Sequence, residues 1–455
     1  MNNNPASSGS PADTYDLLII GAGPGGYRAA EYAAKQGLRV AIVEQDEVGG
    51  TCLNRGCIPT KTYVHSATFA EAFERQQQVV AQLRSGVEGI LSAPGITLLR
   101  GHASFINAST CSVSGGPSCS ISGDAIATNA TAAPTTVTAK NIIIATGSSA
   151  KLLPLSDIND PRVVTSTELL QLSTLPKRLC IIGAGVIGME FASVFQRFGS
   201  EVTVIEYLKE CLPMLDSDIA KRLRKLLEKR GITFKMKTAV ESLADIDADV
   251  ILMATGRRPN VEGLNLEAAG LGSLAVNGLP VDDNFRCIGA TSIYAIGDVN
   301  GRQMLAHAAE MQAVRAVNHI LGRKDGIRFD IMPSAIFTEP EAACVGLSED
   351  ALKALAVSGS PADSRLPVDY RCRKAFWRAN GKALAMDETE GMLKLLSAGD
   401  DDRIIGCHAY GAHAADIVQE VAALMCRDTT VDQLRDMVHI HPTLSEILRT
   451  AAEQQ

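Results

Sequence analysis

The chain has 455 residues, of which 46% are hydrophobic and 21% charged, and its formal net charge is −8. This composition is typical of a globular protein with room for about three domains. The negative net charge and the lack of a basic block argue against a nucleic-acid or anionic-membrane partner. The sequence contains no run of about 18 apolar residues, the length needed to cross a bilayer. The chain starts without a secretory signal pattern and its 11 cysteines show no metal-ligand spacing, so we expect a cytoplasmic protein without a metal site.

The first elements predicted along the chain form a βαβ unit. Residues 1–14 are predicted to be a disordered tail, and the apolar run 15–20 then opens into the turn GAGPGG. An amphipathic stretch follows, and a second apolar run ends at Glu44. Glycines in such a turn let the backbone approach a pyrophosphate, which rests on the positive end of the next helix. We therefore predict a dinucleotide site at this turn, whose glycines are Gly21, Gly23 and Gly26.

Two cysteines, Cys52 and Cys57, follow in the segment GGTCLNRGCIPTK. A disulfide that closes so small a ring removes little entropy from the unfolded chain and is a poor structural staple. Positions i and i+5 of a regular helix face different sides, so a bond between these sulfurs needs a distorted turn, which Gly56 would permit and Pro59 would end. Strain of this kind makes a disulfide easier to reduce. We favour a redox-active pair over two unrelated buried thiols.

The pattern of strand, glycine turn, helix, strand and acid recurs later in the chain. Residues 179–182 precede the turn GAGVIG, which carries Gly183, Gly185 and Gly188, and the next strand ends at Glu206. In both copies the acid stands 23 residues after the first glycine, and each copy is closed by an apolar strand that ends in Ala-Thr-Gly. Two such copies predict two dinucleotide-binding folds in one chain.

The acid of each copy sets a preference among dinucleotides. A carboxylate at the position of Glu44 or Glu206 accepts hydrogen bonds from an adenosine ribose and repels a 2′-phosphate. Both sites are therefore predicted to favour cofactors without that phosphate, and the second site is predicted to bind NAD rather than NADP.

The rest of the chain adds a predicted third unit and one more candidate pair. Residues 107–137 are expected to form β-hairpins with loops, and from about residue 331 strand-like and helical patterns predict an α+β unit. Near the C-terminus, the segment HPTLSE places His441 and Glu446 where they could pair, which would fix the imidazole tautomer and suit it to take a proton from a thiol. The alternative is that Thr443 and Glu446 form only a helix capping box.

Together these motifs resemble the pyridine nucleotide-disulfide oxidoreductases and, within that family, the dihydrolipoamide dehydrogenase branch. The resemblance runs from about Tyr15 to Leu448, and it also rests on the segments IIIATG, ATGRRPN, IYAIGD and MLAH. It implies FAD in the first fold, near Gly21, Gly23, Gly26, Glu44, Gly50, Thr51, Lys61, Ala103, Thr146, Gly147, Ser148, Asp298, Met304, Leu305, Ala306 and His307. It implies NAD in the second fold, near Gly183, Gly185, Gly188, Glu206, Val240 and Gly256.

The resemblance also implies roles for the candidate catalytic residues. Cys57 would lie next to the flavin while Cys52 exchanges with substrate, and Lys61 would lie beside the flavin, paired with Glu190. His441 would be the base and Glu446 would orient it, both supplied by the partner subunit of a homodimer. The expected reaction is oxidation of dihydrolipoamide by NAD+, with a lipoyl domain of a 2-oxoacid dehydrogenase complex or the H-protein of glycine cleavage as partner.

The predicted fold class is therefore α/β, with two Rossmann-like dinucleotide-binding domains and a C-terminal α+β dimerisation domain. The expected boundaries are 15–150 with 280–325 for the FAD-binding domain, 151–279 for the NAD-binding domain and 326–455 for the dimerisation domain.

The sequence departs from the family pattern in three places: a stretch that bears on substrate, a segment of the NAD-binding fold, and residues 107–137, which are unusually low in complexity. The stretch from Lys61 to Gly101 is shorter than expected by about one helix, and residues 240–249 leave hardly any room for the usual small β-meander. An NADH-dependent reductase of another disulfide or small thiol therefore stays open, as does a redox sensor that keeps FAD without turnover. Mercuric reductase would need a second cysteine pair near the C-terminus, and glutathione reductase would bring arginines in place of Glu206.

Overall fold

The computed structural model describes residues 14–115, 134–272, 278–358 and 369–454. The described chain divides into two compact units: residues up to 59, 74–149 and 257–327 belong to the first, and residues 60–73, 150–256 and 328 onward to the second. The predicted tail lies outside the described residues except for Thr14, which already belongs to the first strand. Most of the predicted hairpin region, 116–133, also lies outside them.

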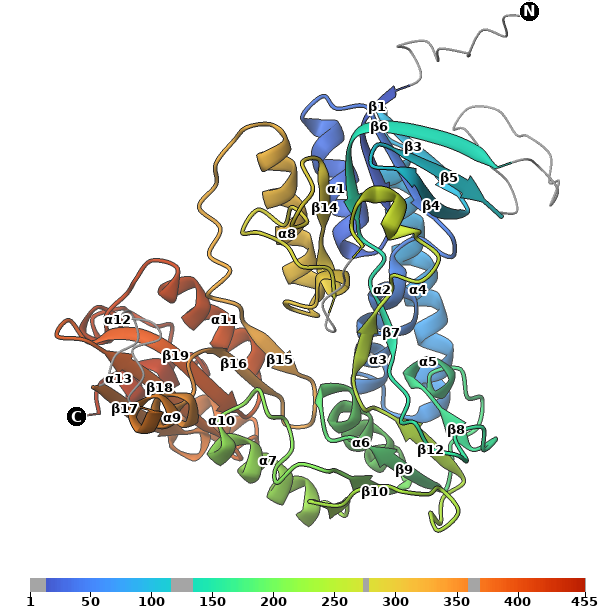
Figure 1. The fold of residues 1–455 in the computed structure, drawn as a ribbon. Coiled ribbons are helices and arrows are strands. Elements are labelled where there is room, and N and C mark those ends of the chain that lie inside the picture. The colour runs from blue at the N-terminus through green and yellow to red at the C-terminus, as the bar shows by residue number, and fades with distance from the viewer. Residues whose placement is uncertain (1–13, 116–133, 273–277, 359–368, 455) are drawn as a thin grey trace, which may run out of the picture. The chain divides into compact units, whose positions relative to one another are not determined.

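The first unit is built on one sheet (Figure 1). Its parallel strands β3 (Ile96–Arg100), β2 (Val40–Glu44), β1 (Thr14–Ile20), β6 (Thr135–Ile144) and β14 (Ile293–Ala295) are neighbours in that order. Strands β4 (His102–Asn107) and β5 (Thr110–Ser114) extend it as an antiparallel hairpin beside β6. The fifth parallel position is filled from far along the chain, and α8 (Ala306–Ile320) likewise packs on α1 (Pro24–Lys35).

Three helices follow the first glycine turn: α2 (Gly50–Arg55), α3 (Cys57–Val64) and α4 (Phe69–Leu91). The expected distortion lies at Gly56, where φ is −143° and ψ is −113°, so α2 ends there and α3 begins at the next residue. The expectation for Pro59 is wrong. It is the third residue of α3, where a missing N–H costs no helical hydrogen bond, so it helps to start a helix rather than end a turn.

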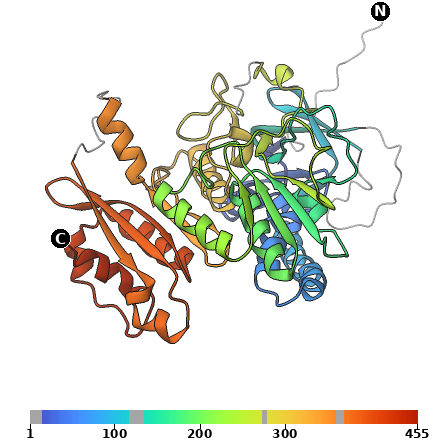
Figure 2. The ribbon, with the colours of Figure 1, turned by 90° about the horizontal axis from the view of Figure 1, so that it is seen from below.

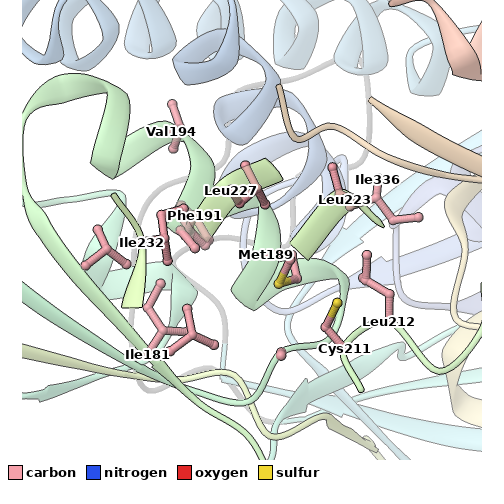
Figure 3. Packing of buried hydrophobic residues seen from close by; sticks show 14 of the residues in the cluster. Ile181, Met189, Phe191, Val194, Cys211, Leu212, Leu223, Leu227, Ile232 and Ile336 are labelled. Atoms are coloured by element: carbon pink, nitrogen blue, oxygen red, sulfur yellow. The ribbon is translucent and has the colours of Figure 1, made fainter. Parts of the chain in front are cut away.

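The second unit begins with a parallel sheet of order β11-β10-β9-β12-β8. Its strands are β8 (Val163–Val164), β9 (Arg178–Ile182), β10 (Glu201–Ile205), β11 (Thr233–Lys235) and β12 (Val250–Met253), and its helices are α5 (Ser166–Leu169), α6 (Val186–Phe198) and α7 (Ser217–Lys229). The apolar faces of α6 and α7 meet over β9 in the cluster drawn in Figure 3, where Phe191, Leu223 and Ile181 are labelled. Residues 236–249, all described, contain no strand, as the trimmed sequence predicts.

The C-terminal part of this unit is an antiparallel sheet, drawn in orange with red helices beside it in Figure 2. Its strands are β15 (Ser334–Ile336), β16 (Ala342–Gly346), β19 (Arg403–Tyr410), β18 (Met392–Ala398) and β17 (Tyr370–Phe376), in that spatial order, and its helices are α9 (Glu349–Ser358), α10 (Gly381–Ala385), α11 (Ala414–Met425), α12 (Val431–Arg435) and α13 (Glu446–Ala452). Both faces of this sheet are buried. Leu393 and Ala409 face the cluster with α11 and α13, whereas Met392 and Tyr410 face the cluster with α6 and α7.

Short elements complete the described chain. Strands β7 (Ser148–Ala150) and β13 (Arg257–Pro259) pair with each other, and 3-10 turns occur at η2 (Leu266–Ala269), η3 (Gly297–Asn300) and η4 (Trp377–Ala379). Within the described ranges, no helix is both long and apolar enough to span a membrane.

Candidate active site

The two glycine turns have nearly the same backbone geometry. Gly21 has φ +102° and Gly183 has φ +108°, and a Cβ on either would lie 2.4 Å from the carbonyl oxygen of the closing strand, that of Ala145 or Ala254. A Cβ at the last glycine of each turn would lie only 1.9 or 2.0 Å from the carbonyl oxygen of the first glycine. Only glycine fits these positions: the positive φ and the close carbonyl exclude a side chain at the first glycine of each turn, and the close carbonyl alone excludes one at the last.

The two acids make matching hydrogen bonds. Glu44 Oε2 accepts from the backbone N–H of Ala22 at 2.6 Å, and Glu206 Oε2 accepts from that of Ala184 at 2.6 Å. The second carboxylate oxygen of each acid accepts another backbone N–H two residues further on, at 2.8 Å for Glu44 and 2.7 Å for Glu206. Each carboxylate is thereby fixed beside its glycine turn, where a ribose of a bound dinucleotide would meet it.

Several predicted glycines border open space. Apart from the adjoining residues of the chain, no atom of the described residues lies within 4 Å of a Cβ built on Gly147, Gly185 or Gly256, and at Gly23 only the Cα of Gly50, at 3.9 Å, comes that close. Helices α1 and α6 begin directly after Gly23 and Gly185, so their free N–H groups face this space. The two turns thus fit the pyrophosphates of two dinucleotides.

The remaining residues predicted around FAD lie in the first unit, apart from Lys61. Gly50 and Thr51 open α2, Thr146 donates its hydroxyl to the carbonyl of Asn260 at 2.6 Å, and Ala103 is buried on β4. Met304 and Leu305 precede α8, which begins with Ala306 and His307.

The buried hydroxyl of Ser148 joins Asp298 to Arg257, a residue that was not predicted from the sequence. The hydroxyl of Ser148 donates to Asp298 Oδ2 at 2.5 Å and accepts from Arg257 Nε at 2.7 Å, and Arg257 Nη2 donates to the Ser148 carbonyl at 2.6 Å. Burial lowers the pKa of Arg257, although the charges of Asp298 and Cys57 oppose that shift. The position of Arg257 directly after Ala-Thr-Gly was the available signal.

The cysteine pair lies on the two sides of the helix break. Cys52 is half-buried on α2, and Cys57 is exposed at the start of α3. A Cβ on Gly56 would lie 2.9 Å from the Thr51 carbonyl oxygen and 3.3 Å from the Cys52 Cα, so the backbone between the cysteines is folded back tightly. Such a turn is what a bond between residues i and i+5 requires.

Two further residues of the first unit brace this turn and were not found from the sequence. Asn54 Nδ2 donates to the carbonyls of Val48 and Gly50, both at 2.9 Å, and Asn54 Oδ1 accepts from Arg84 Nε of α4 at 3.0 Å. Asn54 stands between the two cysteines in the sequence, which was a usable signal, whereas nothing in the sequence marks Arg84.

Lys61 and Glu190 form the expected ion pair within the second unit. Lys61 Nζ lies 2.9 Å from both carboxylate oxygens of Glu190, and Glu190 is only 4% exposed. Val240, predicted near NAD, lies in the loop after β11 and packs against the buried cluster that contains Cys180 and Ile182.

His441 and Glu446 also pair within the second unit. His441 Nδ1 and Glu446 Oε1 are 2.9 Å apart, while the His441 side chain remains 78% exposed. Glu446 Oε2 accepts the Thr443 N–H at 2.9 Å, but the Thr443 hydroxyl donates to the Ile440 carbonyl and Ser445 is the N-cap of α13. The reciprocal bond of a capping box is therefore missing, so a cap alone does not account for Glu446.

The structure thus gathers the predicted residues into local groups. The first unit holds the first glycine turn, the cysteine pair and Asp298, and the second holds the second glycine turn, Lys61 with Glu190, and His441 with Glu446. Among the described residues no cluster of three or more His, Cys, Asp or Glu side chains is arranged to hold a metal ion.

Comparison with known families is consistent with this geometry. The family model "Pyridine nucleotide-disulphide oxidoreductase" matches residues 15–313, and the dimerisation-domain model of the same family matches residues 332–452. The chain belongs to this family. The predicted fold class and family resemblance are confirmed, and membership implies FAD and a pyridine nucleotide as cofactors. The dimerisation domain supports a homodimer.

Individual relatives narrow the activity only to flavin-dependent disulfide oxidoreduction. A protein of Pisum sativum described as mitochondrial dihydrolipoyl dehydrogenase is 34% identical, over 97% of this chain and 92% of its own length. Leghemoglobin reductase of Glycine max is also 34% identical, over 97% of this chain and 88% of its own length. The solved structure of the HOCl-induced flavoprotein disulfide reductase RclA from Escherichia coli matches with a TM-score of 0.84 and 30% identity, covering 96% of this chain and 99% of that one.

The pea alignment extends over 485 positions, although this chain has only 455 residues. The alignment therefore contains gaps in this chain relative to the pea protein.

Proposed function

We propose that this protein oxidises protein-bound dihydrolipoamide to lipoamide with NAD+ as the hydride acceptor, through a redox disulfide between Cys52 and Cys57. The observation that carries the proposal is the His441–Glu446 pair. Its carboxylate orients an exposed imidazole, and helix capping alone does not explain the arrangement. A relative that had lost thiol chemistry would have no need of such a pair.

The reaction begins as a thiol–disulfide exchange. A substrate thiolate attacks Cys52 Sγ, the bond between the cysteine sulfurs breaks, and Cys57 leaves as a thiolate. His441 Nε2 then takes the proton of the second substrate thiol, whose sulfur displaces Cys52, so that the substrate departs as a disulfide and both cysteines are reduced. Bound FAD and NAD supply the two-electron chemistry that returns the cysteine pair to the disulfide.

The hydrogen bond between Nδ1 of His441 and Glu446 supports the role of His441 as the base. A carboxylate on Nδ1 fixes the tautomer in which Nε2 accepts a proton, and it stabilises the imidazolium that results. The fixed carboxylate of Glu206 supports NAD over NADP, because a 2′-phosphate would be placed against a negative charge.

The proposal extends to partners and location. His441 and Glu446 act on the cysteine pair of the other subunit in a homodimer, and the substrate is presented on a lipoyl domain of a 2-oxoacid dehydrogenase complex or on the H-protein of glycine cleavage. The scattered cysteines favour the cytoplasm.

A second candidate is the reduction of another disulfide or small thiol substrate at the expense of NADH. It is favoured by the gaps that this chain shows against the pea protein and by the 30% identity to RclA. In this reading the same cysteines work in the opposite direction, and the substrate differs.

One assay separates the two candidates. Holoenzyme is mixed anaerobically with dihydrolipoamide and NAD+, and NADH formation is followed at steady state. We expect turnover that is lost in Cys57→Ser. A rate no higher than that of Cys57→Ser, together with rapid NADH consumption on a small disulfide, would replace the leading proposal with the second candidate.

A further inference from the structure

Lys61 contacts the aromatic ring of Phe337 as well as the carboxylate of Glu190. The ring of Phe337, which follows β15 directly, has its centroid 4.6 Å from Lys61 Nζ. The backbone N–H of the same residue donates to Glu190 Oε1 at 2.9 Å. Phe337 therefore contacts both partners of the ion pair, one through its ring and the other through its backbone.

The segment that carries Phe337 is itself held firmly against α6. The Glu339 N–H donates to the Ser193 hydroxyl at 3.0 Å, and the Glu339 carboxylate lies 3.4 Å from Arg197 Nη1. Arg230 Nη1 donates to the Glu339 carbonyl at 2.5 Å. Because Glu190, Ser193 and Arg197 all belong to α6, these contacts fix the position of Phe337 relative to Glu190 over two turns of helix.

The chemistry of the three groups explains why the ring matters. The buried carboxylate of Glu190 binds the Lys61 ammonium through both of its oxygens. This contact fixes the position of the positive charge, but it leaves the long lysine side chain free to rotate. An aromatic face within about 6 Å attracts an ammonium and covers one side of it, so it removes that freedom without adding a charge. The backbone N–H bond to Glu190 keeps carboxylate and ring in one frame.

We infer that Phe337 is a positioning residue for Lys61: its ring fixes the lysine ammonium over the Glu190 carboxylate. The inference rests on the proposed function in one respect, namely that Lys61 acts on the flavin side of the reaction. Because Phe337 follows β15 and Lys61 lies on α3, this contact links the C-terminal sheet to α3.

The direct test measures the reactivity of Lys61 itself. Holoenzyme is trace-labelled with an amine-acylating reagent, and the rate at Lys61 is measured by peptide mass spectrometry relative to the exposed Lys225. We expect Phe337→Leu to raise the relative rate at Lys61 by roughly three- to tenfold, as expected for loss of one cation–π contact, and Phe337→Tyr to leave it near the wild-type value.

The matched control is Phe376, a half-buried residue of β17 whose ring lies 4.7 Å from Arg378 Cζ. Phe376→Leu removes the same kind of contact elsewhere in the unit and should not change labelling of Lys61. If Phe337→Leu does not accumulate as folded holoenzyme, Phe337→Met provides the same loss of the ring. An unchanged Lys61 rate in the leucine or methionine variant, or an equal rise in Phe376→Leu, would overturn the inference.

A second readout separates this inference from the proposed function. The reduction potential of the bound flavin should shift in Phe337→Leu and not in Phe337→Tyr. If labelling of Lys61 rises but the potential stays unchanged, Phe337 positions Lys61 as inferred, and it is the flavin-side role of Lys61 in the proposed function that fails.

Discussion

At the scale of single residues, two acids carry specific and separable predictions. Backbone N–H groups hold both carboxylate oxygens of Glu206 and one carboxylate oxygen of Glu446, so the positions of these side chains are fixed before any ligand binds. These side chains are already ordered in the folded protein, so binding a ligand does not carry the entropic cost of ordering them, and this favours ligand binding. For each acid, a glutamine substitution, at Glu446 itself or at Glu201 near Glu206, helps to separate the effect of the charge from an effect on folding.

Replacing Glu206 by Ala should reduce the preference for NAD over NADP. The variant removes the carboxylate that we propose faces the ribose, so the ratio of kcat/KM for NAD to that for NADP should fall by roughly 5- to 150-fold, as expected for loss of an interaction of about 1–3 kcal/mol. Glu201→Gln, at the exposed start of β10, is the control and should leave the ratio unchanged. A variant ratio equal to that of the wild type would contradict the assignment of Glu206.

Replacing Glu446 by Gln tests whether this residue orients His441. The amide can still accept the Thr443 N–H, so thermal stability should change little. The loss of the charge beside His441 should lower kcat/KM for dihydrolipoamide by about 100-fold, the low end of the range for general-base catalysis.

The pKa of Glu446 adds a pH signature to this test. The Thr443 N–H and then His441 lower that pKa, so the carboxylate stays ionised at pH values below its ordinary pKa, and it loses its charge only in more acidic solution. The wild-type activity near neutral pH should therefore not depend on titration of Glu446. A Gln variant with full activity would leave Glu446 with a structural role only.

At the scale of elements, local patterns were sufficient for the dinucleotide folds. Gly21 and Gly183 are required by positive φ and by a carbonyl at 2.4 Å, and these constraints leave a direct trace in the sequence as glycine. The 23-residue spacing from each first glycine to its acid reflects one βαβ unit, which is also local. Pro59 was misread because a proline is equally at home in the first turn of a helix and after a helix end.

Contacts between distant elements could not be predicted in the same way. Lys394 interrupts an apolar strand and would ordinarily be expected to face solvent, but both faces of its sheet are covered. Its Nζ lies 2.7 Å from Asp216 Oδ1 and 2.5 Å from Glu349 Oε2, residues that are 178 and 45 positions away. The pairing depends on how α7 and α9 pack on β18, and a single sequence carries no signal for that.

This buried junction predicts how stability responds to acid. His408 on β19 accepts the Asp216 N–H on Nδ1 at 3.0 Å, and burial lowers the pKa of His408 to about 4. Asp216, Lys394, Asp350 and the backbone of Leu347 are the groups that face this imidazole. Because the unfolded pKa is 6.5, the stabilisation is fully present above pH 6.5 and is lost as the pH falls towards 4.

The loss should amount to about 2 kcal/mol at pH 5, as follows from the two pKa values. His408→Asn keeps an acceptor for the Asp216 N–H but cannot be protonated, so its free energy of unfolding should change less between pH 7 and pH 5. Urea denaturation at both pH values measures the difference. The control is His413→Asn, because His413 lies just before α11 with an exposed side chain. An identical pH dependence in His408→Asn and the wild type would show that His408 does not titrate in this range.

At the scale of the whole molecule, the pair of His441 and Glu446 that we propose as catalytic lies in the dimerisation domain. The His441 side chain is 78% exposed, and the neighbouring Val438 and Ile440 are 98% and 80% exposed, so two apolar side chains lie at the surface beside the proposed base. A second copy of the chain would cover these side chains and would bring the imidazole to a cysteine pair. This is the arrangement proposed for the homodimer.

Subunit complementation tests that arrangement in solution. Cys57→Ser and His441→Ala chains carrying different affinity tags are co-expressed, and the mixed dimer is isolated by two successive affinity steps. If His441 serves the cysteine pair of the other subunit, one site of each mixed dimer combines two intact halves and the other combines two defective ones. The mixed dimer should then regain about half of the wild-type activity, since one of two symmetric sites is whole.

If His441 instead served its own subunit, each site would contain one defect and the mixed dimer would be as inactive as either parent. Mixed dimers of two differently tagged Cys57→Ser chains provide the baseline, because they contain no intact cysteine pair under either arrangement. The outcome therefore depends only on which subunit supplies the imidazole. Return of activity would place His441, and with it the exposed apolar side chains of Val438 and Ile440, at the interface between the subunits.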